Sequence, residues 1–380
     1  MEARLNILII NWQDITNPLA GGAEVHLHEV FERIAERGHS VTLFCHHFDD
    51  APRSEIRNGM KIIRFGHRLI FNFVVPFYYF LFLKRNNYDV IVDDVNKIPF
   101  YLPLFIHRPI QGVTHHLFGK SIFLETFFPF ALYVHLAEKL IKPIYRKIHF
   151  IIGSKSTCDE YLRWGFPPDR VAIVNYCVNH STYYPDEKNQ YDPNLIGYFG
   201  RLKKYKSIDH LLQAFSKIQR DFPALRLHII GDGDDKERLM KIAHELQIDA
   251  SVEFLGFIPE GEKAKALQKM NIVVNTSSKE GWGLTVVEAN ACGIPVIAAN
   301  VQGLRDSVVD GKTGLLYEYA DIDDLVSKMR SLLFDAQRRD ELRREAIRWA
   351  KSFDWENAAN ETMKYLNLTI SNYHSRKNAR

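Results

Sequence analysis

The sequence has few cysteines and only a small net charge. Its four cysteines, Cys45, Cys158, Cys177 and Cys292, have no short repeated spacing and no clustered histidines that would complete a zinc site. We therefore expect reduced thiols in a reducing compartment and no bound metal. The formal net charge of +3 is too small to indicate a nucleic-acid partner.

Signals for export and for repeats are also missing. The first residues, MEARLNILIINW, lack the long apolar core and small-residue cleavage site that a secretory leader requires, so we expect a cytoplasmic protein. No repeat of 20–50 residues and no low-complexity tract is evident. A chain of 380 residues with 46% hydrophobic and 25% charged residues is typical of two packed domains.

The first half of the chain reads as alternating strands and helices. Residues 5–10 form a continuous apolar run, a glycine turn follows at 21–22, an amphipathic stretch covers 23–37, and another apolar run covers 41–45. Strand, glycine loop, helix and strand in this order predict a βαβ unit, and unbroken apolar runs favour a parallel sheet covered on both faces. Further strands are expected at 60–65, 89–93, 110–114 and 148–152.

The second half repeats this pattern. Apolar strands are expected at 195–200, 225–231, 252–256, 272–277 and 295–299, with helices between them that include one starting near Ser207 and one at 236–246. Two such runs predict two doubly wound α/β domains, which we expect to face each other across a cleft. In open α/β sheets, ligands bind beyond the carboxyl ends of the strands, so loops after strands are the places to search.

The polar, proline-bearing segment 178–193 has no periodicity and marks the expected boundary. We expect an N-terminal domain over 1–178 and a C-terminal domain over 194–355. A helix at about 357–380 is expected to pack back on the first domain.

Two cations follow the strand at 195–200. Gly200-Arg201-Leu202 comes directly after it, and Lys206 stands just before the next helix. Cations near a helix N-terminus form a natural diphosphate site, although two solvated loop charges would look the same in sequence.

Two carboxylates flank a glycine loop after the strand at 272–277. Gly281 and Gly283 let the backbone approach a ligand, and Glu280 before them suits ligand hydroxyls. Thr285-x-x-Glu288 also fits a capping box, which is compatible with ligand binding. We interpret two other polar motifs as structural: Gly231-Asp232-Gly233 as a turn, and Asp93-Asp94 as a strand-end cap.

These pieces, in this order, resemble glycosyltransferase family 4, the glycosyl transferases group 1 of the GT-B fold. The resemblance rests on Gly21-Gly22-Ala23-Glu24, the Gly200–Lys206 motif, Gly231-Asp232-Gly233, Leu255-Gly256-Phe257, Glu280 with Glu288, Gly293-Ile-Pro-Val, Gly303-Leu-Arg-Asp and Asp310-Gly-Lys-Thr-Gly. It covers nearly the whole chain. Ser207 stands where the family often has glycine, and Trp282 where it often has phenylalanine.

The resemblance implies a retaining transfer of a sugar from a nucleotide diphosphate, without a metal or another cofactor. Arg201 and Lys206 would bind the diphosphate, Glu288 the ribose, and the backbone near Phe257 would face the base. Gly22 would approach the phosphates. The implied donor-binding residues are Gly22, Arg201, Lys206, Phe257, Gly281, Trp282, Gly283, Leu284, Thr285 and Glu288, with His115 and Glu280 as the catalytic residues.

The family also places a histidine after a first-domain strand. Thr114-His115-His116 follows the strand at 110–114, and we favour His115, with His116 as the rival. Alternatives to a transferase are a nucleotide-sugar epimerase or a phosphorylase of the same fold, or a catalytically silent binding subunit.

A UDP-sugar is the first expectation for the donor and GDP-mannose the second; the acceptor is a glycan or a lipid-linked glycan of cell-envelope polysaccharide synthesis. Two apolar, aromatic runs in the first half, 69–83 and 122–134, lie beside basic residues, including those of 138–147. Such runs suit a protein that lies on the inner face of an anionic membrane. Two ordinary buried helices over the first sheet are the alternative interpretation.

Overall fold

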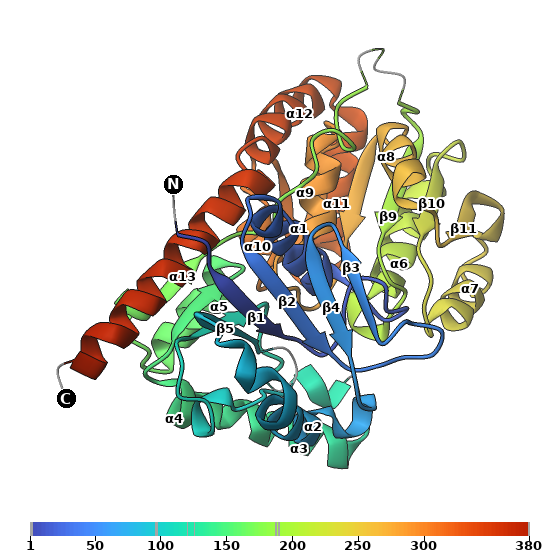
Figure 1. The fold of residues 1–380 in the computed structure, drawn as a ribbon. Coiled ribbons are helices and arrows are strands. Elements are labelled where there is room, and N and C mark those ends of the chain that lie inside the picture. The colour runs from blue at the N-terminus through green and yellow to red at the C-terminus, as the bar shows by residue number, and fades with distance from the viewer. Residues whose placement is uncertain are drawn as a thin grey trace. The chain divides into compact units, whose positions relative to one another are not determined.

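The computed structural model describes residues 3–95, 98–119, 121–124, 126–186, 188 and 191–378. It divides into two compact units, Met1–Tyr176 with Trp355–Arg380, and Cys177–Asp354 (Figure 1). Some segments named above reach beyond the described residues. These outlying residues are Met1, Glu2, Ala379 and Arg380 at the ends, Glu125 in the run 122–134, and Glu187, Asn189 and Gln190 in the boundary segment.

The first unit is built on an eight-stranded sheet with the order β3-β4-β2-β1-β5-β6-β7-β8. All neighbours in it are parallel except β3 and β4. The expected strands are present, with ends that differ by about a residue. Its strands are β1 (Asn6–Ile10), β2 (Ser40–Cys45), β3 (Ser54–Arg57), β4 (Met60–Arg64), β5 (Val90–Asp94), β6 (Ile110–Thr114), β7 (His149–Ile152) and β8 (Val171–Ile173).

A long C-terminal helix belongs to this unit. The helix α13 packs against α1, and the Thr369 hydroxyl donates to Gln111 Oε1 at 2.7 Å (Figure 1). At its start, Glu356 pairs with Arg37 of α1's end at 2.6 Å. The α-helices of the unit are α1 (Gly22–Glu36), α2 (Phe71–Tyr78), α3 (Phe128–Lys139), α4 (Ile141–Tyr145), α5 (Lys155–Arg163) and α13 (Trp355–Asn378).

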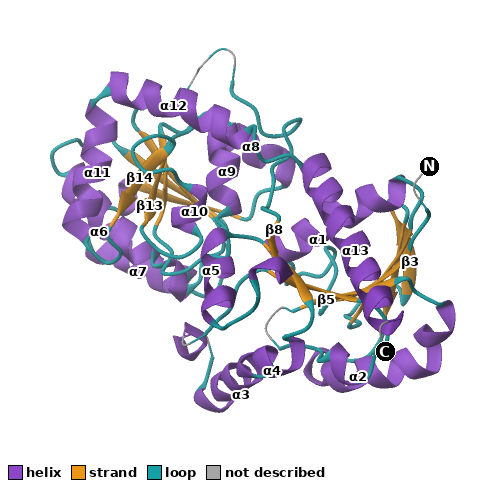
Figure 2. Ribbon diagram, turned by 90° about the vertical axis from the view of Figure 1, so that its left-hand side faces the viewer, coloured by secondary structure: helices purple, strands orange, loops and turns teal. Residues whose placement is uncertain are grey.

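The second unit has a fully parallel six-stranded sheet with the order β11-β10-β9-β12-β13-β14. Helices lie on both faces of this sheet (Figure 2). Its strands are β9 (Leu195–Phe199), β10 (Arg226–Ile230), β11 (Val252–Gly256), β12 (Ile272–Asn275), β13 (Val296–Ala299) and β14 (Gly314–Tyr317). Its α-helices are α6 (Ile208–Gln219), α7 (Lys236–Glu245), α8 (Glu260–Gln268), α9 (Leu284–Ala291), α10 (Leu304–Ser307), α11 (Ile322–Phe334) and α12 (Ala336–Ala350).

Both sheets reverse their strand order once. The chain leaves β9 toward β10 on one side and later returns to pair β12 on the other side of β9. In the first sheet, the chain leaves β1 toward β2 on one side and later returns to pair β5 on the other side of β1. Ligand sites of open α/β sheets lie at such reversals, beyond the carboxyl ends of the strands. The loops after β1, β5, β9 and β12 are therefore the ones to inspect.

A buried ion pair stabilises the loop after β1. Arg64 Nε donates to Asp14 Oδ2 at 2.6 Å, and neither side chain is exposed to solvent. Arg64 also pairs with Glu55 and donates to the Pro52 carbonyl. Burial alone would raise the pKa of Asp14, but hydrogen bonds from Arg64 and Thr16 outweigh it and lower the pKa from 3.8 to about 2. The pair therefore stabilises the fold above about pH 4 and loses this effect as pH falls toward 2.

We predict that Asp14→Asn lowers the free energy of unfolding by about 3–5 kcal/mol, because it leaves the Arg64 guanidinium buried beside a neutral amide. Chemical denaturation at pH 7 measures the change. The control is Asp159→Asn, which breaks the exposed pair with Lys155 on α5 and is expected to cost at most about 1 kcal/mol. Equal losses in the two variants would contradict the role assigned to Asp14.

Candidate active site

The loop after β9 lies against the loop after β10. The amide of Leu202 donates to the Asp232 carbonyl at 2.9 Å. A Cβ added to Gly231 would lie 1.9 Å from the Gly200 carbonyl oxygen, and one on Gly233 would lie 2.1 Å from that of Leu202. The two glycines are thus required by the close approach of a second loop, in addition to the turn expected from the sequence.

Lys206 is held against the end of β12 by backbone contacts. It ends a short 3₁₀ turn, η7 (Lys204–Lys206). Carbonyl groups of this turn accept hydrogen bonds from the loop that follows β12. The Thr276 hydroxyl donates to the Lys206 carbonyl at 2.9 Å, and the Ser278 amide donates to that of Tyr205 at 2.8 Å. These bonds place the lysine side chain on the loop that carries Glu280.

Lys206 and Glu280 form an ion pair, and both side chains are largely buried. The Ser277 hydroxyl donates to the same Glu280 oxygen at 2.8 Å. Burial by itself lowers the pKa of Lys206, but the charge of Glu280 outweighs it and raises the pKa above its ordinary value. Lys206 is therefore a permanent cation, and sequence reasoning had not connected it with Glu280.

Arg201 differs from Lys206 in its surroundings. Its side chain is exposed at the start of the same loop, and its carbonyl accepts a hydrogen bond from the Tyr198 hydroxyl at 3.2 Å. Among the described residues, no carboxylate pairs with its guanidinium. A free guanidinium on a loop fixed by backbone bonds is available to an anionic ligand.

The helix α9 begins one residue before the expected capping box. Gly283 occupies its N-cap position with a φ of +96°, a conformation that favours glycine. Thr285 therefore lies inside the first turn, and its hydroxyl accepts from Asn275 Nδ2 at 3.5 Å. The capping box predicted for Thr285 and Glu288 is wrong, because the glycine takes the cap. The amides of the first turn of an α-helix generally lack partners within the helix, although that of Val286 donates to the Gly283 carbonyl at 2.9 Å.

Glu288 pairs with a lysine that sequence reasoning missed. Lys263 of α8 places Nζ 2.7 Å from Glu288 Oε2, and the same ammonium lies 4.7 Å from the centre of the Phe199 ring. Both charged side chains are largely buried. The Glu288 carboxylate is thus held in place by a lysine of α8 that lies beside the last residue of β9. The sequence could not identify Lys263, because the contact depends on how α8 packs against β9.

The other residues expected to contact the donor divide into exposed and buried ones. Phe257, just after β11, is 80% exposed. Trp282 is buried, and its ring packs against Phe353 with centroids 5.1 Å apart, so only its backbone is available to a ligand. Gly281, Leu284 and Thr285 are partly exposed on the Glu280–Glu288 loop.

Ser207, the departure from glycine noted above, has a φ of +48° as the N-cap of α6. This left-handed conformation explains why glycine suits the position. The Ser207 hydroxyl forms a hydrogen bond with the Tyr319 hydroxyl at 3.0 Å, which helps to stabilise the serine in this conformation.

In the first unit, the glycine turn after β1 opens α1. The amide of Gly21 donates to the carboxylate of Glu24 at 2.7 Å, and burial raises the pKa of Glu24. A Cβ on Gly22 would lie 4.0 Å from the Tyr176 ring. The turn and Tyr176 therefore form one wall of the region that contains His115.

His115 lies in a buried cluster at the carboxyl ends of β5 and β6. Its Nε2 lies 3.1 Å from the carboxylate of Asp94, and its Nδ1 is hydrogen-bonded to the Tyr176 hydroxyl. Burial alone lowers the pKa of His115, but Asp94 outweighs it and raises the pKa. Next to it, burial and the His115 charge lower the pKa of His26 to about 3. His116 is half-buried, and its ring contacts Phe118.

The prediction that Asp93 and Asp94 cap the strand end is wrong. The Tyr145 hydroxyl donates to Asp93 at 2.6 Å, and burial raises the pKa of Asp93 to about 7. Asp94 pairs with His115 instead. Both carboxylates point into the unit, and the adjacency of β5 and β6, which sequence alone does not give, makes the second contact possible.

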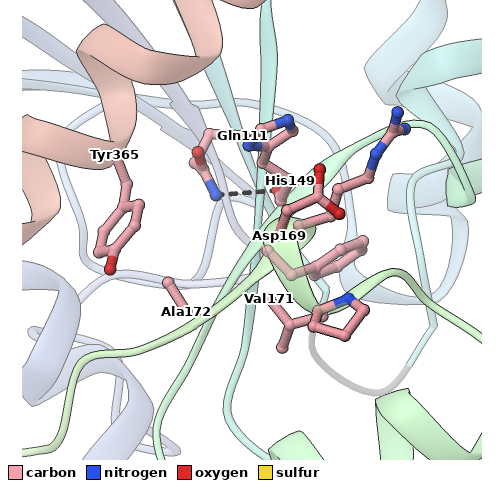
Figure 3. Close-up of a pocket in the computed structure, with 9 residues that line it drawn as sticks. Gln111, His149, Asp169, Val171, Ala172 and Tyr365 are labelled. Atoms are coloured by element: carbon pink, nitrogen blue, oxygen red, sulfur yellow. Dashed lines mark hydrogen bonds between the residues drawn. The ribbon is translucent and has the colours of Figure 1, made fainter.

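A hollow in the first unit lies away from all of these residues. Its volume is about 180 Å³, and its lining includes Gln111, His149, Val171 and Tyr365 (Figure 3). Gln111, His149 and Val171 stand at or near the amino ends of their strands, which is the opposite edge from His115. Within the described parts of the chain, no group of histidine, cysteine or acidic side chains has the arrangement of a metal site.

Two family profiles cover most of the chain. Glycosyltransferase Family 4 matches residues 20–182, and Glycosyl transferases group 1 matches residues 182–349. The chain belongs to glycosyltransferase family 4.

Curated relatives of this glycosyltransferase match part of their length. A D-inositol 3-phosphate glycosyltransferase from Rhodococcus opacus is 31% identical over 239 residues, which is 59% of this chain and 54% of the relative. One from Thermomonospora curvata is 32% identical over 216 residues, 51% and 50% of the two chains. The matches thus span about half the length of these relatives.

Solved structures match over nearly the whole glycosyltransferase chain. A sucrose-phosphate synthase from Thermosynechococcus elongatus has a TM-score of 0.81 at 21% identity, over 97% of this chain and 100% of that one. HepE from Anabaena, solved with UDP and glucose, has a TM-score of 0.76 at 17% identity, over 96% and 100%. These likenesses confirm the expected GT-B fold.

We predict that Asp94→Asn lowers the pKa of His115, because burial then acts without the compensating carboxylate. A ¹H–¹⁵N NMR titration of the histidine rings measures the change. Asp159→Asn, far from the cluster on the surface of α5, is the control and is expected to leave His115 unchanged. A His115 pKa that is the same in Asp94→Asn and in the native protein would contradict the pairing.

Proposed function

We propose that this glycosyltransferase moves a hexose from a nucleotide diphosphate to an acceptor with retention of the anomeric configuration. The observation that carries the proposal is the pair of cations on the β9 loop, beside the strand reversal between β9 and β12. Lys206 is a buried cation, and Arg201 is exposed without a carboxylate partner among the described residues. Arginine and lysine form strong charge-assisted hydrogen bonds to phosphate oxygens, so two cations on one loop suit a diphosphate.

The family resemblance supplies the remaining roles. Glu288, held by Lys263, is proposed to bind the ribose, and the exposed segment at Phe257 to face the base. Glu280 and the amides of Gly281 to Leu284 are proposed to bind the transferred sugar, and Thr285 is proposed to contact the donor. Gly22 is proposed to approach the phosphates, and His115 is proposed to be a catalytic residue, with His116 as the rival histidine.

In this proposal the bond from the anomeric carbon to the phosphate oxygen breaks, and negative charge grows on the leaving diphosphate. Arg201, Lys206 and the N-terminus of α9 are preorganised to stabilise that charge. The acceptor hydroxyl forms the new bond on the face from which the diphosphate leaves. A pair of carboxylates of the glycoside hydrolase kind is not needed.

The donor is proposed to be a UDP-sugar, with GDP-mannose second. HepE, which has the same fold, was solved with UDP-glucose, and this supports a uridine nucleotide. The acceptor is proposed to be a lipid-linked glycan or glycolipid of envelope polysaccharide synthesis, used at the inner face of the membrane. WaaG, another protein of this fold, is a glycosyltransferase involved in lipopolysaccharide biosynthesis, and this supports such an acceptor class.

A panel of nucleotide sugars tests the proposal. The donor is expected to raise the melting temperature of the protein, and product release of the matching nucleoside diphosphate is expected with an acceptor extract. A nucleotide sugar that is epimerised, or a sugar 1-phosphate formed from inorganic phosphate, would identify one of the rival enzymes. Binding without turnover of any donor would identify a silent subunit.

We predict that Arg201→Ala and Lys206→Ala each lower kcat by about 10²–10³-fold, because each removes a preorganised charge that contacts the leaving group. Lys204→Ala is the matched control, since Lys204 is an exposed lysine of the same turn. Its turnover is expected to stay near that of the native enzyme. Near-native turnover of the Arg201 or Lys206 variant would remove the proposed phosphate site.

We predict that Glu280→Gln lowers turnover but binds the bare nucleoside diphosphate as tightly as the native enzyme, or more tightly. The substitution takes away a sugar contact and also frees the Lys206 ammonium from its carboxylate partner. Calorimetry with UDP and with GDP measures the affinity. A loss of diphosphate affinity in this variant would show that Glu280 orders the phosphate site rather than binding the sugar.

A further inference from the structure

The first unit exposes an unusual number of large apolar side chains in two segments. In residues 69–82, which form η1 (Arg68–Ile70), α2 and η2 (Tyr79–Leu83), Leu69, Phe73, Phe77 and Phe82 are each more than half exposed. In residues 123–140, which include α3, the same holds for Phe127 and Phe128. We call the exposed apolar side chains of these two segments the aromatic face.

Each segment contributes to the core with its other side. Phe71, Val75 and Tyr79 are buried beneath α2 and η2, and Ala131 and Val134 are buried beneath α3. The inner sides of the two segments fit the interpretation as buried helices. The segments cover the unit as buried helices do, yet they lack the polar outer side that such helices normally present to water.

The two segments share one side of the unit. Both views place α2, α3 and α4 along the same side (Figures 1 and 2). Phe105 extends the first segment, because its ring centroid lies 6.0 Å from that of Phe80, and Leu104 beside it is exposed. Monomeric proteins rarely expose a contiguous apolar surface of this kind unless it binds a partner.

The exposed charged side chains within residues 66–88 and 126–148 are all basic. Arg68, Lys84 and Arg85 flank the first segment. Lys139 lies near the end of the second segment and Lys142 follows it, and all five side chains are exposed. No described residue in 66–88 or 126–148 is an exposed acid. The single acid there, Glu138, is buried and accepts hydrogen bonds from the amides of Phe118 and Gly119 at 2.6 and 2.7 Å.

We propose that the aromatic face docks on a bilayer that contains anionic phospholipid. Aromatic and aliphatic side chains enter the interfacial region, and the flanking cations contact the lipid phosphates. No described helix is long and apolar enough to cross a membrane, so the contact is one-sided. The proposal deepens the proposed function by naming the surface that would meet a lipid-linked acceptor, and it stands on the face itself.

Vesicle flotation of the full chain without any donor tests the docking. The protein is expected to float with phosphatidylglycerol-containing vesicles at low salt, to float less at high salt, and to stay at the bottom with phosphatidylcholine alone. Lys139→Gln with Lys142→Gln is expected to weaken binding about fivefold for each charge removed. Phe77→Ser with Phe128→Ser, which alters exposed side chains alone, is expected to abolish flotation.

Leu368→Ser with Lys61→Gln is the matched control, since it removes an exposed apolar side chain and an exposed cation outside the aromatic face. Its flotation is expected to equal that of the native chain, and melting temperatures verify that all variants fold. A native chain that never floats would overturn the proposal, as would equal flotation of the Phe77/Phe128 variant.

A dimer in light scattering that the Phe77/Phe128 variant abolishes, without vesicle binding, would assign the face to a second copy and also overturn it. Transfer to a soluble acceptor is measured separately. Enzyme that is active but does not float would contradict only the proposed membrane docking. Protein that floats but transfers no sugar would contradict only the proposed function.

Discussion

The ion pair between Lys206 and Glu280 is the interaction on which the candidate site of the second unit depends. It joins two loops that are 74 residues apart in sequence and that leave neighbouring strands, β9 and β12. Hydrogen bonds from the Thr276 hydroxyl and the Ser278 amide to carbonyls of the lysine turn fix that turn before any ligand is present. Neither charge of the pair is buried alone, and an unpaired buried charge would destabilise the fold more than the pair does.

The same principle governs the rest of both units. Each buried charge near a strand end has an opposite charge or a hydrogen-bond donor: Glu288 has Lys263, Asp94 has His115, and Asp14 has Arg64. These partners lie on different strands or helices, so the parallel sheets align them. Preorganised charge at the carboxyl edge is what transfer chemistry on a diphosphate requires, since the protein then has little reorganisation to do as charge develops.

The sequence predicted the sheets well because parallel strands buried on both faces are continuous apolar runs. It missed three strands. The residues of β3 and β8 are half-exposed or exposed and carry no such run, and β14 is only four residues long with two half-buried positions. For the candidate site, it predicted Arg201, Lys206 and Glu280 one at a time, from their places after strands. It could not find their contacts, nor Lys263 and Tyr176, because those depend on strand order. The capping box failed because a glycine at positive φ can take the N-cap position, which the spacing of Thr285 and Glu288 does not reveal.

The aromatic segments show a different limit of sequence patterns. Periodicity separates a helix with one apolar face from a helix with none, but 69–83 is apolar on every side, so it fits a buried helix and a membrane surface equally. A buried helix and a membrane-binding helix differ in whether other parts of the protein cover the side that faces away from the core. That depends on the tertiary structure. Once α2 and α3 are seen to cover the core with one side only, the absence of exposed acids among the described residues around the other side gains meaning. A water-facing surface has no physical reason to exclude carboxylates, whereas a surface that meets lipid phosphates does.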